Sequence, residues 1–364
     1  MKDETTPPQQ TSGDSPEFSG NIFLFHAFDI GDDINLEAAR KDRAINTVPL
    51  QLPKYFKNYH TPLAIELPHP HESTKLSSCK IHSFGAVSLT YKIPFADTLE
   101  NVRKEFGELH NQYLEQSVID VKSVFKKVQS YVNQPKLFQM RAHYLVLQLD
   151  KLPPGMSATQ LKEQFGGVIA STLRFETQTL SEYQKNDILE SSVGYFRGEL
   201  TIIDTDAAFV YDREYEEILD LFEFANLQHL ELRYFDRVLD QQLNKIYEGG
   251  EGFKIPLSAY LPFTGPTKGP VEALGKLKVD ISVITERLEG SIKLAGEPYV
   301  AELYELLSQN LDLKNWHQSI ERKLDIIHDI QSNHQHRIDV LREDTLTVLI
   351  IVLIMIELIV AIVK

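Results

Sequence analysis

Cysteine is almost absent from this sequence, with Cys79 as the single thiol. One thiol cannot form an intramolecular disulfide, so the chain is suited to a reducing compartment. The first twenty residues lack the apolar stretch of a secretory signal. With one lysine, no arginine and several acids, they also do not suit a mitochondrial presequence. Their Pro, Ser, Thr, Gln and acidic content predicts a disordered acidic tail over residues 1–20.

An excess of positive charge is also missing. The chain has a net charge of −15 and a sequence pI of about 5.3, and it contains no run of Lys and Arg. Proteins that bind phosphates of nucleic acids usually present a basic face. The composition therefore does not favour nucleic acid as a partner.

The sequence lacks the usual catalytic and nucleotide-binding motifs. It has no phosphate-binding G-x-x-x-x-G-K-[ST] loop, no G-x-G-x-x-G, no G-x-S-x-G and no H-E-x-x-H. The nearest Gly-Lys stretch, residues 264–269, has the wrong spacing. We therefore expect that the protein is not an enzyme and that it has no catalytic residue and no bound cofactor.

One segment contains residues of the types that bind metals. His69, His71, Cys79 and His82 could supply the four ligands of a tetrahedral zinc site. Their spacing matches no zinc-finger pattern, and nearby prolines indicate an exposed loop in which histidines are solvated. The four residues remain weak metal candidates beside that simpler interpretation.

A long hydrophobic run closes the sequence. Residues 345–363 are apolar except for two threonines and Glu357, and as a helix they would span about 28 Å, close to the hydrocarbon thickness of a bilayer. This predicts one transmembrane helix that anchors the chain from its C-terminal end. An ionisable residue at the depth of Glu357 is costly in lipid. It indicates either a proton or cation site, or a carboxyl group hydrogen-bonded to a neighbouring helix.

A heptad pattern precedes the hydrophobic run. Mostly apolar residues alternate in steps of four and three from Tyr299 to Leu341, and Pro298 suits a helix start. The pattern predicts a coiled-coil stalk that makes a homo-oligomer, and the alternative is a long helix packed on its own domain. The residues predicted to mediate self-association are Leu303, Leu306, Asn310, Leu313, His317, Ile320, Leu324, Ile327, Gln331, His334, Ile338 and Leu341.

The remaining sequence predicts a body that mixes strands and helices. Alternating apolar residues predict strands over 22–28, 81–93 and 141–149, a hairpin with arms at 193–196 and 200–203, and a further edge at 207–211. Helical spacing predicts helices over residues 97–128, 212–247 and 271–288.

The predicted fold is an α+β soluble body with a mixed sheet, then a long helical stalk and one transmembrane helix. The domains follow as residues 1–20 (tail), 21–250 (α+β domain), 251–270 (Gly/Pro loop), 271–344 (helical stalk) and 345–363 (transmembrane helix).

Several short stretches resemble a known family. Residues 197–200 (Arg-Gly-Glu-Leu), 218–225, 297–305 and 354–358, with 84–87 upstream, are similar in order and spacing to the required-for-meiotic-nuclear-division family. The resemblance covers about residues 190–364 and implies a non-catalytic, homo-oligomeric membrane protein. Mitochondrial members lie in the inner membrane and support organelle translation. This chain lacks a presequence, so the resemblance points to a bacterial inner-membrane member.

These observations lead to two expected functions. The first is a non-enzymatic, tail-anchored scaffold that forms a homo-oligomer and holds a cytoplasmic α+β domain at the lipid bilayer. The second is an oligomeric channel or transporter with Glu357 in the membrane path. The sequence indicates no particular protein partner.

Overall fold

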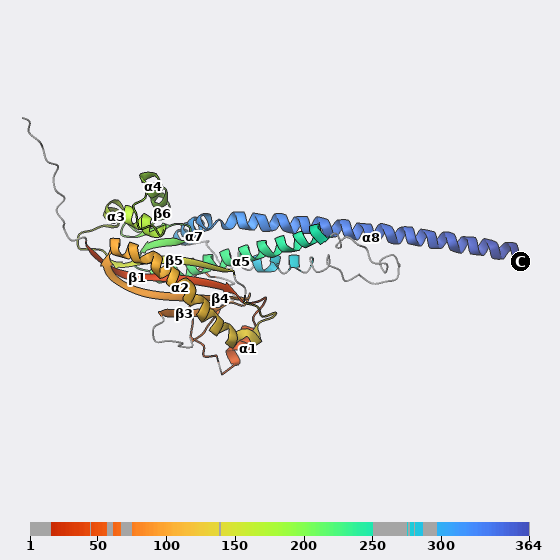
Figure 1. Cartoon of the computed structure of the whole chain (residues 1–364), viewed down its shortest axis with the longest axis horizontal. Coiled ribbons are helices and arrows are strands. Elements are labelled where there is room, and N and C mark those ends of the chain that lie inside the picture. The colour runs from red at the N-terminus through yellow and green to blue at the C-terminus, as the bar shows by residue number, and fades with distance from the viewer. Residues whose placement is uncertain are drawn as a thin grey trace, which may run out of the picture. The chain divides into compact units, whose positions relative to one another are not determined.

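Figure 1 shows the computed structural model of the chain. The chain divides into two compact units. The described residues are 16–43, 45–56, 61–66, 75–137, 140–249, 275, 277–279, 281–286 and 297–363. Unit 1 comprises Met1–Pro53, Thr61–Leu227 and Leu294–Leu311, and unit 2 comprises Lys54–His60, Gln228–Lys293 and Asp312–Lys364. The predicted loop at 251–270 lies outside the described residues.

Unit 1 is built on an eight-stranded mixed sheet with the order β2-β3-β4-β1-β5-β8-β7-β6. Every neighbouring pair is antiparallel except β5 and β8, which run parallel. The predicted α+β fold with a mixed sheet is therefore confirmed. The strands are β1 (Glu17–Asp29), β2 (Leu63–Ala64), β3 (Leu76–Ile81), β4 (Ala86–Thr98), β5 (Arg141–Lys151), β6 (Ser192–Val193), β7 (Leu200–Ile203) and β8 (Ala207–Tyr211).

The sheet of unit 1 has helices on both faces (Figure 1). One face packs against α2 (Leu99–Val128) and α3 (Ala158–Leu173), and together they enclose the main apolar core. The opposite face packs against the first turns of α5 (Tyr215–Gly249), where the rings of Tyr144 and Phe222 stack with centroids 5.4 Å apart. The shorter helices of unit 1 are α1 (Leu36–Lys41), the 3-10 helix η1 (Gln129–Tyr131), α4 (Glu182–Glu190) and α7 (Pro298–Asn310).

Several predicted boundaries in unit 1 differ from the structure. Strand β1 begins at Glu17, inside the predicted tail, because Phe18 already contributes to the core. The single strand predicted over 81–93 is two strands, since the chain turns at Gly85, whose φ is +99°. The segment Ala207–Tyr211 is not an edge, because β8 lies between β5 and β7.

Unit 2 contains the later part of α5, helical residues among 275–286, and α8 (Leu313–Val363). Lys323 on α8 forms ion pairs with Asp236 at 2.7 Å and Asp240 at 2.6 Å on α5. The helix predicted to run unbroken from Tyr299 is two helices, α7 and α8, which are separated at Asp312 with φ +56°. Within the described part of the chain, α8 is the one helix long and apolar enough to cross a membrane.

Candidate functional site

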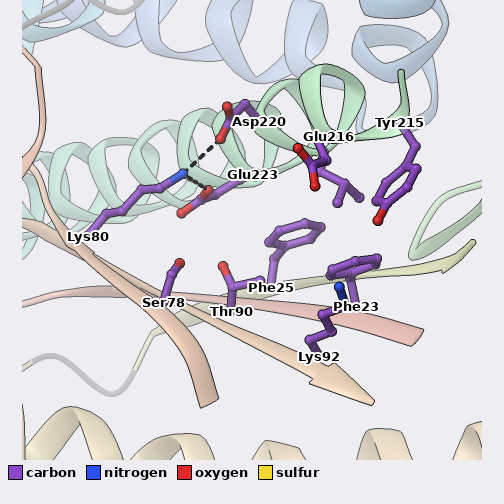
Figure 2. Close-up of a pocket in the computed structure, with 11 residues that line it drawn as sticks. Phe23, Phe25, Ser78, Lys80, Thr90, Lys92, Tyr215, Glu216, Asp220 and Glu223 are labelled. Carbon is purple, nitrogen blue, oxygen red and sulfur yellow. Dashed lines mark hydrogen bonds and ion pairs between the residues drawn. The ribbon is translucent and has the colours of Figure 1, made fainter. Parts of the chain in front are cut away.

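A small pocket lies in unit 1 between the sheet and the start of α5 (Figure 2). Its volume is about 240 Å³, and strands β1, β3 and β4 provide one wall while α5 provides the other. The pocket is therefore on the face of the sheet opposite α2 and the main apolar core.

Lys80 forms the charged centre of this pocket. Its ammonium group contacts Asp220 Oδ1 at 2.8 Å and Glu223 Oε2 at 2.6 Å, as the dashed lines in Figure 2 show. Strand alternation explains the position of the lysine: Cys79 and Ile81 belong to the core on the α2 side, so Ser78 and Lys80 project toward α5. The two carboxylates are three residues apart, which puts them on one face of the helix.

This cluster keeps its charges although it is largely buried. Burial raises the pKa of Glu223, but the attraction of Lys80 outweighs it, so the pKa lies below its ordinary value. Burial likewise opposes charge on Lys80, and its two carboxylate partners raise its pKa above the ordinary value. Burial raises the pKa of Asp220. We therefore treat Lys80 and Glu223 as a charged pair, with Asp220 as the second, more exposed acid.

The remaining walls are aromatic and polar. Phe23 and Phe25 of β1 line the sheet side, and the ring of Tyr215 on α5 lies 6.1 Å from that of Phe23. Lys92 is exposed, and its Nζ lies 5.5 Å from the centroid of Phe23, a cation–π distance. Thr90 contributes a hydroxyl group from β4. The pocket thus combines apolar rings with charged and hydroxyl groups, which is the usual composition of a small-molecule site.

The predicted metal candidates do not come together in the described residues. His69 and His71 lie outside that part of the chain. Cys79 and His82 are each 1% exposed rather than on an exposed loop. Burial raises the pKa of the Cys79 thiol and lowers the pKa of His82 to about 3. No group of three His, Cys, Asp or Glu residues that could hold a metal is found among the residues that the structure describes.

Half of the residues predicted to mediate self-association are buried within the chain itself. Leu303, Leu313, Ile320, Leu324, Ile327 and Ile338 are buried, while the other six are partly exposed. Within unit 1, Asn310 Nδ2 on α7 donates a hydrogen bond to Ser191 Oγ at 3.0 Å. This burial matches the alternative of a helix packed on its own domain, and a coiled coil between chains is not confirmed.

The side chains at the apolar end of α8 are exposed rather than buried. Its large apolar side chains from Leu346 to Val363 are 41% to 82% exposed, and Glu357 is exposed among them. This single apolar helix is compatible with single-pass anchoring in a membrane.

The sequence alone did not identify the pocket residues. Lys80 belongs to a strand predicted only from Ile81 onward, and Asp220 and Glu223 occur in a helix with a wide apolar arc. The available signal was the pair of acids at helical spacing inside that arc, because acids are rarely buried without a cationic partner. Their partner, 140 and 143 residues away, could not be located from local patterns.

The fold and the pocket together define an α+β protein with a mixed sheet, a polar pocket against α5 and one long helix with an apolar end. The chain belongs to the family described as the N-terminal domain of uncharacterized protein MJ0711, whose model matches residues 19–217. The matched segment holds the whole sheet except the first two residues of β1, and it includes most of the pocket, while Asp220 and Glu223 lie just beyond it.

One curated relative adds to this assignment. "Uncharacterized protein MJ0711" of Methanocaldococcus jannaschii is 28% identical to this chain over 210 residues, covering 54% of this chain and 59% of the relative. The match thus spans less than two thirds of that relative's length. No solved structure matches the chain. These comparisons support a domain family of unknown function, and they do not support the name of the meiotic-division family.

Proposed function

We propose that this protein is a non-enzymatic, single-pass membrane protein in which the end of α8 spans a bilayer and holds the α+β unit at the membrane. The supporting observation is the exposed apolar surface from Leu346 to Val363. An apolar surface of this length on a soluble monomer would favour aggregation, whereas in lipid it is solvated.

Membrane extraction tests the anchor. Membranes from cells that produce the full chain are washed with alkaline carbonate, which releases peripheral proteins and leaves spanning helices in the pellet. The full chain is expected in the pellet, and a shortened chain ending at Asp344 in the supernatant. Release of the full chain by carbonate would contradict the proposal.

We further propose that the anchored chain forms a homo-oligomer through its membrane segment. Glu357 supports this part, because a carboxyl group at that depth is stabilised by a hydrogen bond to a neighbouring helix. Most of the apolar heptad residues of α8 are buried inside the chain, so the membrane segment is the better-supported contact between subunits. Light scattering in detergent should then give an oligomer for the full chain, a smaller particle for Glu357→Leu, and a monomer for the chain ending at Asp344. Equal monomeric masses for all three would contradict it.

A channel or transporter is the second candidate function, and the same carboxyl group favours it. If several membrane helices surround a path, Glu357 would face that path rather than a neighbouring helix. Proteoliposomes that contain the full chain should then show cation or proton flux that Glu357→Gln abolishes. Ordered oligomers without any flux would exclude this function and leave the scaffold.

We also propose a family relationship, a topology and a membrane for this protein. The order of residues 197–200, 218–225 and 297–305 supports a relationship to the required-for-meiotic-nuclear-division family. We propose a cytoplasmic α+β unit and a bacterial inner membrane in preference to a mitochondrial one. Protease treatment of intact spheroplasts, which should leave the α+β unit uncut, tests this topology.

A further inference from the structure

The pocket contains a buried hydroxyl group that lacks a hydrogen-bond partner within the described part of the chain. The side chain of Thr90 is on a residue only 7% exposed, and its Oγ1 has no hydrogen-bond partner among the described residues. Figure 2 shows Thr90 and Ser78 directed from the sheet toward α5, into the pocket. An unpaired buried hydroxyl group is costly, and a valine of the same shape would avoid the cost. The hydroxyl group is therefore explained best by a ligand that completes its hydrogen bonding.

The charges around the pocket favour a cation. Lys80 and Lys92 provide two positive charges, and Glu216, Asp220 and Glu223 provide three negative ones, which leaves one negative charge in excess. The N-terminal backbone of α5 adds about half a positive charge. The acidic residue Glu217, in the same first turn but outside the pocket lining, offsets this contribution.

Lys80 is a poor partner for an incoming anion. Its ammonium group already holds Asp220 and Glu223 at 2.8 and 2.6 Å, so an anion beside it would also meet both carboxylates. An ammonium group, in contrast, could donate hydrogen bonds to Thr90 Oγ1 and to Glu223 Oε1, the buried carboxylate oxygen that has no hydrogen-bond partner within the described residues. The rings of Phe23 and Phe25 offer apolar contact on the same side.

We propose that this pocket binds a small organic cation that carries primary ammonium groups on a short aliphatic chain. One ammonium group donates to the hydroxyl group of Thr90 and lies beside the Asp220–Glu223 carboxylates, and the aliphatic chain packs on Phe23 and Phe25. The volume of about 240 Å³ is below the range of about 300–1,000 Å³ found for drug-sized ligands, which restricts the ligand to a small molecule.

Titration calorimetry on the full chain in a nonionic detergent tests this inference, with putrescine as the probe. Thr90→Val removes the hydroxyl group, keeps the shape of the side chain and should weaken putrescine binding about tenfold. The thermal midpoint of this variant should stay equal or rise, because the unpaired group is gone. Glu216→Gln should also weaken binding, and by clearly more than Glu217→Gln, which removes an equal charge outside the pocket lining.

Three results would overturn the proposal. One is the absence of putrescine binding to the folded wild-type chain. Another is equal affinity in the wild type and Thr90→Val, which would show that the amine binds elsewhere. The third is binding of succinate in place of putrescine, lost in Lys92→Met, which would identify the pocket as an anion site.

Discussion

Gly85 is a residue whose backbone leaves no room for a side chain. Its φ of +99° is in the left-handed region, and a Cβ atom added there would lie 1.8 Å from the carbonyl oxygen of Gly31. We expect Gly85→Ala to lower the free energy of unfolding by about 3 kcal/mol, since the variant combines backbone strain with a clash against backbone. Urea denaturation followed by circular dichroism measures this change.

Two other glycines serve as controls for that prediction. Gly155 has φ +83° with no atom within 4 Å of an added Cβ, so Gly155→Ala isolates the strain and should cost about 1 kcal/mol. Gly198 also has open space and no positive φ, so its alanine variant should be close to neutral. Equal losses for Gly85→Ala and Gly155→Ala would refute the proposed clash.

Lys80 neutralises two acids at the pocket. Lys80→Met should cost about 3–5 kcal/mol, because it leaves Glu223 buried without its cation. The double variant Lys80→Met/Glu223→Met should recover a large part of the loss, since it removes the uncompensated charge. Lys92→Met, at an exposed position, should change the stability by less than about 1 kcal/mol. If the double variant were less stable than Lys80→Met, the uncompensated charge would not be the cause.

Three histidines lie close together on the α2 side of the sheet. The ring of His143 lies 4.6 Å from that of His110 and 6.4 Å from that of His26. His26 is fully buried, and within the described residues neither of its ring nitrogens has a hydrogen-bond partner. Burial, together with His143, His110 and Arg141, lowers the pKa of His26 to about 3.

This low pKa of His26 predicts a loss of stability in acid. Above pH 6.5, His26 is neutral in both the folded and the unfolded chain, so its contribution is fully present. Below pH 6.5 the unfolded chain takes up a proton that folded His26 accepts only near pH 3. The free energy of unfolding should therefore fall by about 1.4 kcal/mol per pH unit from this residue across that window.

Substitution of His26 tests the acid effect directly. Between pH 6.5 and pH 5, His26→Leu should lose about 2 kcal/mol less stability than the wild type. The matched control is His328→Leu, at an exposed position on α8, which should keep the wild-type slope. Parallel pH profiles for wild type and His26→Leu would contradict the prediction.

At the scale of an element, the buried heptad residues of α8 stabilise unit 2 by packing within the chain. Ile327 is fully buried, whereas the next residue toward the N-terminus, Ile326, is 40% exposed. Ile327→Ala should therefore cost about 2–5 kcal/mol, and Ile326→Ala should cost clearly less. Both variants should keep the mass of the wild type in light scattering. A lower mass for Ile327→Ala with unchanged stability would instead support the coiled coil between chains.

The sequence predicted elements well where one local pattern dominated. The alternation in 141–149 and the helical spacing in 97–128 correspond to β5 and α2. The sequence predicted fewer elements correctly where contacts between distant residues determine the structure. The break at Asp312 interrupts a heptad pattern that continues on both sides, and α3 and α4 were not predicted. The pocket depends on a contact between β3 and α5 that no local pattern contains.

At the scale of the whole molecule, the apolar run was the feature that the sequence predicted most directly. Its composition alone indicated a membrane segment, and the structure adds that the run is the exposed end of the longer helix α8. The binding partners depend on the surfaces of other molecules, and the compartment depends on the cell that makes the protein. Neither follows from the apolar run or from the fold.

Site-directed spin labelling in proteoliposomes tests the central claim, that the end of α8 crosses a bilayer. A Cys79→Ala background receives single substitutions Leu349→Cys, Ile354→Cys and Ile359→Cys, with Asp329→Cys as a control at an exposed position nearer the start of α8. We expect the three labels to be accessible to lipid-soluble oxygen and protected from a water-soluble nickel complex, with the reverse at position 329. Nickel accessibility at all four positions would contradict the membrane anchor.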